Sequence, residues 1–255
     1  MFLRTESFKQ FIRLYPIVTS LIAIQLVVWL LILLFPIGIG DALFQWGAGV
    51  NLLIHQGEYW RLVSAIFIHD PNGIMHVLFN CFSLVLFGPA LEQMLGKLKF
   101  LLVFLFTGAF GNLFTYIIEP TQFTIHFGAS GAIYGLLGLY LYMIFFRKHL
   151  IDPSSSQIVI VILIIGVLMS LFRPNINLAA HLFGLIGGFA LGPIILSRAK
   201  PYNPWLKQRS REDSTASFDP NRWNKRRFPW KKYVIPLLWG IVIILGLLGL
   251  FGGIL

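Results

Sequence analysis

Charge is scarce in this 255-residue sequence. Only 12% of the residues are charged and 57% are hydrophobic, whereas an ordinary soluble domain carries about 25% charged residues. This shortage excludes a soluble globular enzyme, and the high hydrophobicity excludes an intrinsically disordered chain. Cysteine is equally scarce, because Cys81 stands alone inside an apolar run and no internal disulfide can form. The remaining class is an all-α protein that crosses a membrane several times.

Long apolar runs, in contrast, are abundant. About 20 apolar residues are enough for a helix to cross a bilayer. Seven membrane helices are predicted, at residues 17–35, 74–93, 99–118, 129–146, 156–172, 178–197 and 233–254. The long connection 36–73 mixes Trp and Arg with short apolar pieces, so we expect it to lie partly in the membrane as an interfacial or re-entrant loop.

A polar, proline-containing stretch separates the last apolar run from the first six. The chain is therefore expected to comprise a cytoplasmic segment (1–16), a six-helix core (17–197), a basic cytoplasmic linker (198–232) and a seventh membrane helix (233–255). Eleven basic and three acidic residues give the linker a net charge of +8. Two interpretations stay open: the linker binds anionic lipid headgroups, or it serves only as a topology signal.

The positive charges fall on one side of the predicted helices. With the N-terminus in the cytoplasm, 18 of the 20 Lys and Arg residues are cytoplasmic, and only Arg61 and Arg173 lie outside. This distribution satisfies the positive-inside rule. Because topology accounts for the net charge of +10, we expect no nucleic-acid partner.

Four polar residues inside the apolar runs are candidates for a functional site, because polar groups at membrane depth are expensive. They are His76 and Asn80 in the second run, Ser130 at the start of the fourth, and His181 early in the sixth. These three runs all start on the outer side, so the four residues are predicted at comparable depth. His76 and Asn80 are four residues apart and share one helix face.

Small residues surround two of these candidates. Gly131 follows Ser130, and Gly184 with Gly188 forms a G-x-x-x-G after His181. Such residues allow helix backbones to approach closely. We therefore expect His181 within hydrogen-bonding reach of the Ser130 hydroxyl, as a base-activated serine nucleophile requires. His76 and Asn80 could then donate to a developing oxyanion.

Each of these features also has an ordinary structural explanation. A Gly/Ala/Ser cluster is typical of helix packing, and the His76–Asn80 pair could simply join two helices. His55, His69 and His126 lack metal-ligand spacing, so neither a metal nor another cofactor is expected. A channel or transporter is disfavoured, since no acidic residue lies deep in a run and no inverted repeat is visible.

From about Trp60 to Gly192 the sequence resembles the rhomboid family of intramembrane serine proteases. The matching motifs, in chain order, are Trp60-Arg61, His76-x-x-x-Asn80, Gly128-Ala129-Ser130-Gly131 and Ala180-His181-x-x-Gly184. The resemblance implies a polytopic rhomboid-like six-helix bundle, with one extra C-terminal membrane helix in this chain. That six-plus-one arrangement occurs in the family, although bacterial members with six helices are commoner.

The resemblance also implies roles for individual residues. Ser130 would be the nucleophile and His181 the general base of a dyad that has no Asp. The further implied positions are His76, Asn80 and the Ser130 backbone N–H for the oxyanion hole, with Tyr134 and Gly128 in support.

The resulting expectation is an intramembrane serine endopeptidase that cuts transmembrane segments of other membrane proteins within the lipid bilayer. We expect a multi-pass protein of a bacterial plasma membrane, with its active site opening to the outside. Two alternatives stay open: a catalytically silent rhomboid-like factor that binds membrane proteins, and a small-solute channel or transporter. The sequence does not predict the oligomeric state or the physiological substrate.

Overall fold

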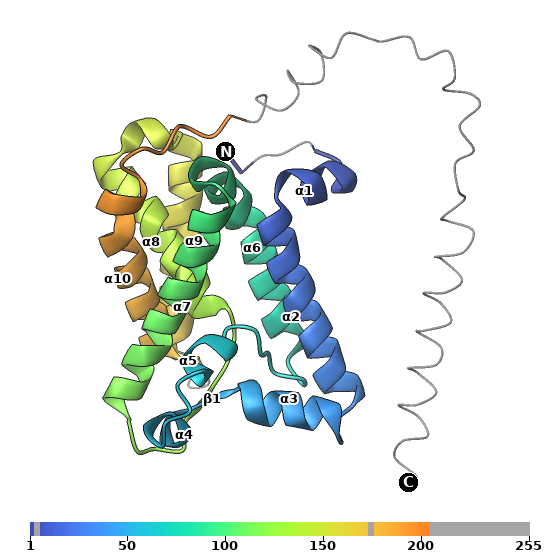
Figure 1. The fold of residues 1–255 in the computed structure, drawn as a ribbon. Coiled ribbons are helices and arrows are strands. Elements are labelled where there is room, and N and C mark those ends of the chain that lie inside the picture. The colour runs from blue at the N-terminus through green and yellow to red at the C-terminus, as the bar shows by residue number, and fades with distance from the viewer. Residues whose placement is uncertain (3–5, 173–175, 204–255) are drawn as a thin grey trace, which may run out of the picture.

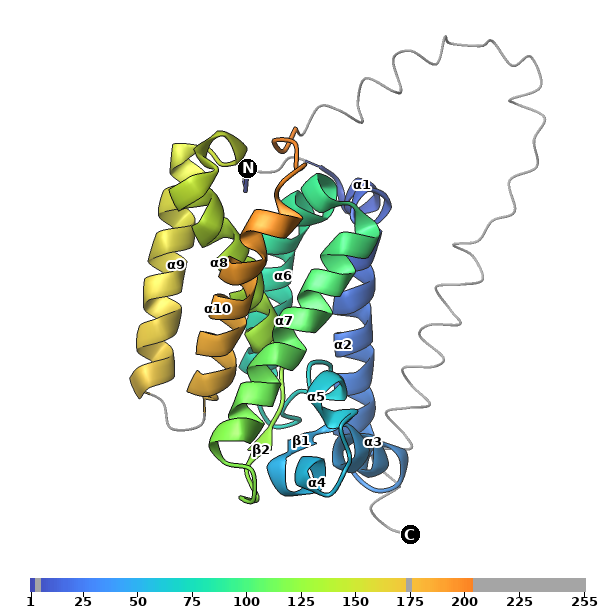
Figure 2. The ribbon, with the colours of Figure 1, turned by 60° about the vertical axis from the view of Figure 1, so that its left-hand side comes forward.

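Six apolar helices dominate the computed structural model, which describes residues 1–2, 6–172 and 176–203. They are α2 (Pro16–Leu34), α6 (Ile74–Leu95), α7 (Lys97–Ile118), α8 (Ser130–Phe146), α9 (Pro153–Phe172) and α10 (Leu178–Ile195). Five of them are long and apolar enough to cross a membrane, and α8 is a shorter apolar helix of 17 residues. The helices lie side by side in one bundle (Figure 1, Figure 2), which confirms the predicted polytopic helical fold. The predicted seventh helix 233–255, and the linker beyond residue 203, lie outside the described residues.

Helix α8 lies at the centre of this bundle. It contacts α6, α7, α9 and α10, and Leu136, Leu139 and Tyr140 on it are completely buried. The Tyr140 hydroxyl donates to the Phe87 carbonyl at 2.7 Å, so this buried polar group has a partner. Because Ser130 is the first residue of this central helix, it lies at the end of α8, close to the helices that surround it.

The N-terminus of α2 is capped by an acidic side chain from another helix. Glu92 on α6 is buried, and its two carboxylate oxygens accept from the backbone N–H groups of Ile17 and Val18 at 3.0 and 2.9 Å. These amides have no acceptor within their own helix. The carboxylate supplies one and also complements the positive end of the helix dipole.

The connection 36–73 contains several short elements that we had not predicted. They are α3 (Ile39–Gly47), β1 (Gly49–Val50), α4 (Asn51–His55) and α5 (Arg61–Ser64). Strand β1 pairs antiparallel with β2 (Ile125–His126), just before α8. These elements gather at the end of the bundle opposite α1 (Phe8–Leu14), as both views show (Figure 1, Figure 2).

Candidate active site

Ser130 and His181 lie in direct contact. The Ser130 Oγ is 2.7 Å from His181 Nε2, a distance typical of a strong hydrogen bond. Ser130 is the first residue of α8, and His181 lies in the first turn of α10. His181 is buried, while Ser130 is only partly covered. The contact has the geometry of a serine hydroxyl beside a base.

Glycines bring the two helices this close. A Cβ added at Gly184 of α10 would lie closer than 3.0 Å to the Gly131 carbonyl oxygen of α8, and one at Gly188 would collide with the Gly135 carbonyl in the same way. Only hydrogen atoms at these positions allow the backbones to touch. The close approach predicted from the small residues is therefore present.

The start of α10 is fixed by a residue that the sequence reasoning missed. Asn177 caps α10, and its Oδ1 accepts from the Ala180 backbone N–H at 2.9 Å and from the Thr115 hydroxyl of α7 at 3.1 Å. The cap orients the first turn, which carries His181. An Asn directly before the apolar run that begins at Leu178 was the available signal.

The His181 ring is held on its other sides by two residues. Tyr134 of α8 stacks on it, with ring centroids 4.2 Å apart and an interplanar angle of 13°. The Ser170 Oγ, near the end of α9, lies 2.7 Å from His181 Nδ1. Tyr134 stood among the predicted residues, but Ser170 did not, because a single Ser in an apolar run has no spacing that relates it to Ser130 or His181.

Around Gly128 the backbone has a conformation that suits glycine. Its φ is +114°, and an added Cβ would lie 2.8 Å from the His76 Nε2. His76 therefore lies against the backbone just before Ser130. Asn80 is buried and donates to the His76 carbonyl at 2.8 Å, whereas its Oδ1 has no hydrogen-bond partner among the described residues. The Asn80 amide thus bonds to its own helix, and its proposed role in an oxyanion hole stays a prediction.

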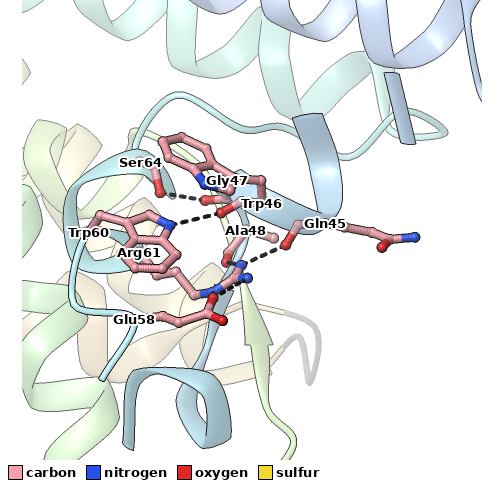
Figure 3. A network of polar contacts seen from close by, with 8 residues as sticks. All are labelled: Gln45, Trp46, Gly47, Ala48, Glu58, Trp60, Arg61 and Ser64. Atoms are coloured by element: carbon pink, nitrogen blue, oxygen red, sulfur yellow. Dashed lines mark hydrogen bonds and ion pairs between the residues drawn. The ribbon is translucent and has the colours of Figure 1, made fainter. Parts of the chain in front are cut away.

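The connection between α2 and α6 is tied together by a buried arginine (Figure 3). Arg61 forms an ion pair with Glu58 and donates to the carbonyls of Gln45 and Ala48 at 2.6 and 2.7 Å. Every acceptor comes from the same connection. The guanidinium thus satisfies backbone carbonyls that no regular element would pair.

This ordered connection in turn positions the backbone that leads into α8. The Ala65 carbonyl, just after α5, accepts from the Gly128 N–H at 2.9 Å. One turn earlier, the Leu62 carbonyl accepts from Asn112 of α7 at 2.9 Å. Together with the β1–β2 pairing, these bonds place the residues that precede Ser130.

Two histidines lie buried beside this backbone. Burial, and the charge of nearby His76, lower the pKa of His69 to about 3, and burial lowers the pKa of His126 to about 4. Both rings are neutral at physiological pH. In the part of the chain that the structure describes, neither ring nitrogen of His126 has a hydrogen-bond partner. Within residues 1–2, 6–172 and 176–203, no group of three or more His, Cys, Asp or Glu side chains is placed to hold a metal ion.

Comparison with known proteins gives a consistent family match. The model of the Rhomboid domain matches residues 56–198. The chain is 50% identical over 194 residues to "Putative rhomboid protease YdcA" of Bacillus subtilis (strain 168), covering 75% of this chain and 94% of that protein. It is 38% identical over 149 residues to "Rhomboid protease GluP" of the same organism, covering 58% of this chain but only 28% of the relative. "RHOMBOID-like protein 5" of Arabidopsis thaliana is 33% identical over 153 residues, 60% of this chain and 49% of that protein.

Proposed function

Since the chain belongs to the rhomboid family, we propose that this multi-pass membrane protein is an intramembrane serine endopeptidase. Its substrates are transmembrane segments of other membrane proteins, or the residues next to them. The observation that carries the proposal is the 2.7 Å contact between Ser130 Oγ and His181 Nε2. A catalytically silent family member has no need of a serine hydroxyl aligned with an imidazole nitrogen.

The contact supports acyl transfer in two stages. As Ser130 Oγ attacks the carbonyl carbon of the scissile peptide, its proton passes to His181 Nε2. His181 then donates that proton to the leaving amine, and the C–N bond breaks to give an acyl-enzyme. In the second stage a water gives its proton to His181 and attacks the ester, and the returning proton restores Ser130 while the acid product leaves.

The oxyanion of each tetrahedral intermediate needs donors beside Ser130. As the first residue of α8, Ser130 has a backbone N–H with no acceptor in its own helix, and the helix dipole favours negative charge there. His76 lies against Gly128, two residues away. Asn80 would complete the set by turning its amide from the His76 carbonyl toward the substrate. We propose these three groups as the oxyanion hole.

The proposed orientation has the N-terminus in the cytoplasm and Ser130 toward the outside. With 17 residues, α8 is about 26 Å long, which is shorter than the hydrocarbon core of about 30 Å. If α8 begins inside the outer half of the bilayer, its first residue, Ser130, lies within the hydrocarbon region. A substrate helix must expose its peptide bond there, so segments that unwind easily near their outer ends are the expected targets.

A fluorophosphonate probe for activated serines, used with a model transmembrane substrate, tests the proposal. The wild-type protein in liposomes should be labelled and should cleave the substrate. Ser130→Ala should lose both reactions, and His181→Ala should lose nearly all activity, because nucleophile and base act as a unit. Ser20→Ala, which changes an exposed serine on α2, is the matched control and should behave as wild type. If the folded wild-type protein is not labelled and does not cleave the substrate, the proposal is wrong and the protein is a catalytically silent member of the family.

A further inference from the structure

We propose that Ser170 is a positioning residue that orients the His181 ring and fixes its tautomer. This inference rests on the proposed function, because it assigns the third member of the same site. Ser130, His181 and Ser170 would then form a line of three side chains from α8, α10 and α9. No acidic residue is needed in this line.

The distances place the two serines on opposite nitrogens of one ring. Ser170 Oγ lies 2.7 Å from Nδ1 and Ser130 Oγ lies 2.7 Å from Nε2 of His181. Ser170 is 4% exposed and His181 8%. Water therefore has little access to the Nδ1 side, and Ser170 is the partner that the protein itself provides there.

Counting hydrogens assigns the direction of each bond. The Ser170 Oγ is also 2.7 Å from the Gly166 carbonyl, which can only accept, so the Ser170 hydroxyl proton points there. Its oxygen then accepts from His181 Nδ1–H. This tautomer leaves Nε2 free to accept from Ser130 Oγ–H, as a general base must.

The opposite tautomer leaves a hydrogen without a partner. If Nε2 carried the proton, it would donate to Ser130 Oγ, and Ser170 would donate to Nδ1. The Ser130 hydroxyl proton would then have no acceptor within the described part of the chain, where His181 Nε2 is its hydrogen-bond partner. The arrangement thus favours the catalytically competent form.

A second feature brings Ser170 to this place. Gly166, one turn before it on α9, faces Tyr134, and a Cβ there would collide with the Tyr134 hydroxyl. The Tyr134 hydroxyl lies 3.4 Å from Ser170 Oγ, while its ring stacks on His181. Because Gly166 has no side chain, the Tyr134 hydroxyl fits against α9, and α9 can pack close to α8. Tyr134 and Ser170 enclose the imidazole together.

A hydroxyl suits this position better than a carboxylate. When His181 takes the Ser130 proton, its Nδ1–H becomes a stronger donor, and the Ser170 oxygen stabilises the resulting cation. An ionised Asp at the same depth would be costly to bury. A neutral hydroxyl should, however, contribute less to the rate than a carboxylate that orients the histidine. Loss of such a carboxylate lowers kcat by about 10⁴-fold in a soluble serine protease.

The test compares full-length Ser170→Ala with wild type in liposomes. We expect kcat to fall roughly 10- to 100-fold, the range found for hydrogen-bond partners that orient metal-bound histidines, with KM nearly unchanged. Labelling by the fluorophosphonate probe should slow by a similar factor. Ser170→Thr, which keeps the hydroxyl, should recover most of the rate. The matched control is Ser155→Ala, which removes the hydrogen bond from the Ser155 hydroxyl to Asp152 at the other end of α9 and should lower stability without lowering kcat.

Nitrogen NMR of the protein labelled with ¹⁵N-histidine reads the tautomer directly. The wild-type signal of His181, assigned by its loss in His181→Ala, should show protonated Nδ1. In Ser170→Ala it should shift toward protonated Nε2 or a mixture. The proposal is overturned if the tautomer stays unchanged, or if a folded Ser170→Ala keeps the wild-type kcat. Failure of the proposed function looks different, because the wild-type protein itself would then neither label nor cleave.

Discussion

Replacing Gly184 by alanine is expected to pull Ser130 and His181 apart. The new Cβ would lie closer than 3.0 Å to the Gly131 carbonyl oxygen and 3.0 Å from its carbon, and ordinary contact begins at 3.4 Å. Both atoms belong to the backbone of α8 and cannot rotate away. The two helices must therefore separate at this point by more than 0.4 Å, which is the difference between 3.0 Å and the 3.4 Å of an ordinary contact.

The reacting groups lie next to this contact. Gly131 follows Ser130, and Gly184 is three residues after His181. The bond of 2.7 Å between Ser130 and His181 would lengthen past about 3.1 Å, the edge of useful hydrogen-bond geometry. Because a misplacement of about 1 Å can cost 100-fold in rate, we expect kcat to fall about 10- to 100-fold. Overpacking should also lower the free energy of unfolding by about 1–3 kcal/mol.

The assay is cleavage of a model transmembrane substrate in liposomes, with thermal unfolding measured on the same samples. Gly187→Ala is the matched control on the same helix, because its Cβ would meet the Phe110 side chain at 2.9 Å, and a side chain can yield. This control should keep most of the activity. If folded Gly184→Ala matches Gly187→Ala in kcat, the close backbone contact does not set the distance between Ser130 and His181.

Three further outcomes are expected. Asn80→Ala should lower kcat by up to about 10²–10³-fold with little change in folding, as the loss of an oxyanion donor does; an unchanged rate in a single-turnover assay would assign Asn80 to helix packing. The free energy of unfolding should decrease as the pH falls from 6.5 toward 3, because unfolded His69 takes up a proton that the buried ring, with its pKa of about 3, refuses. In unfolding experiments in detergent, the free energy of unfolding should change with pH by up to about 1.4 kcal/mol per pH unit for each such group. This pH dependence should be weaker in His69→Gln. A chain ending after Asn203, whose carbonyl accepts from the Gln93 side-chain amide at 2.9 Å, should still label with the serine probe; a folded but unreactive product would place residues 204–255 in the working enzyme.

The membrane helices could be predicted from the sequence because their signal is local. Five of the helices are long and apolar enough to span the bilayer, and α8 is a shorter apolar helix. The predicted bounds agree with α2, α6, α7, α8, α9 and α10 to within a few residues. The start of α9 also follows from its own sequence, since Asp152 accepts from the Ser155 backbone N–H and hydroxyl. These signals lie within, or directly next to, the helix that each of them predicts.

The connection between α2 and α6 could not be predicted, because its elements depend on distant partners. The carbonyls of Gln45 and Ala48 are satisfied by Arg61, and β1 pairs with a strand far away in the sequence. Short segments of this kind carry no periodic pattern. Ser170 was missed for the same reason, since only the packing of α9 against α8 and α10 brings its hydroxyl to His181.

The cap that Glu92 provides has a consequence for biogenesis. During synthesis α2 leaves the ribosome well before α6, so the amides of Ile17 and Val18 have to stay hydrated until Glu92 arrives. The cap of the first helix is thus completed only when its later neighbour docks. Glu92 in turn loses water on docking, and the two amides replace it. The amides of α2 and the carboxylate of α6 therefore satisfy one another only when both helices are in place, which ties the first apolar helix of the bundle to the second.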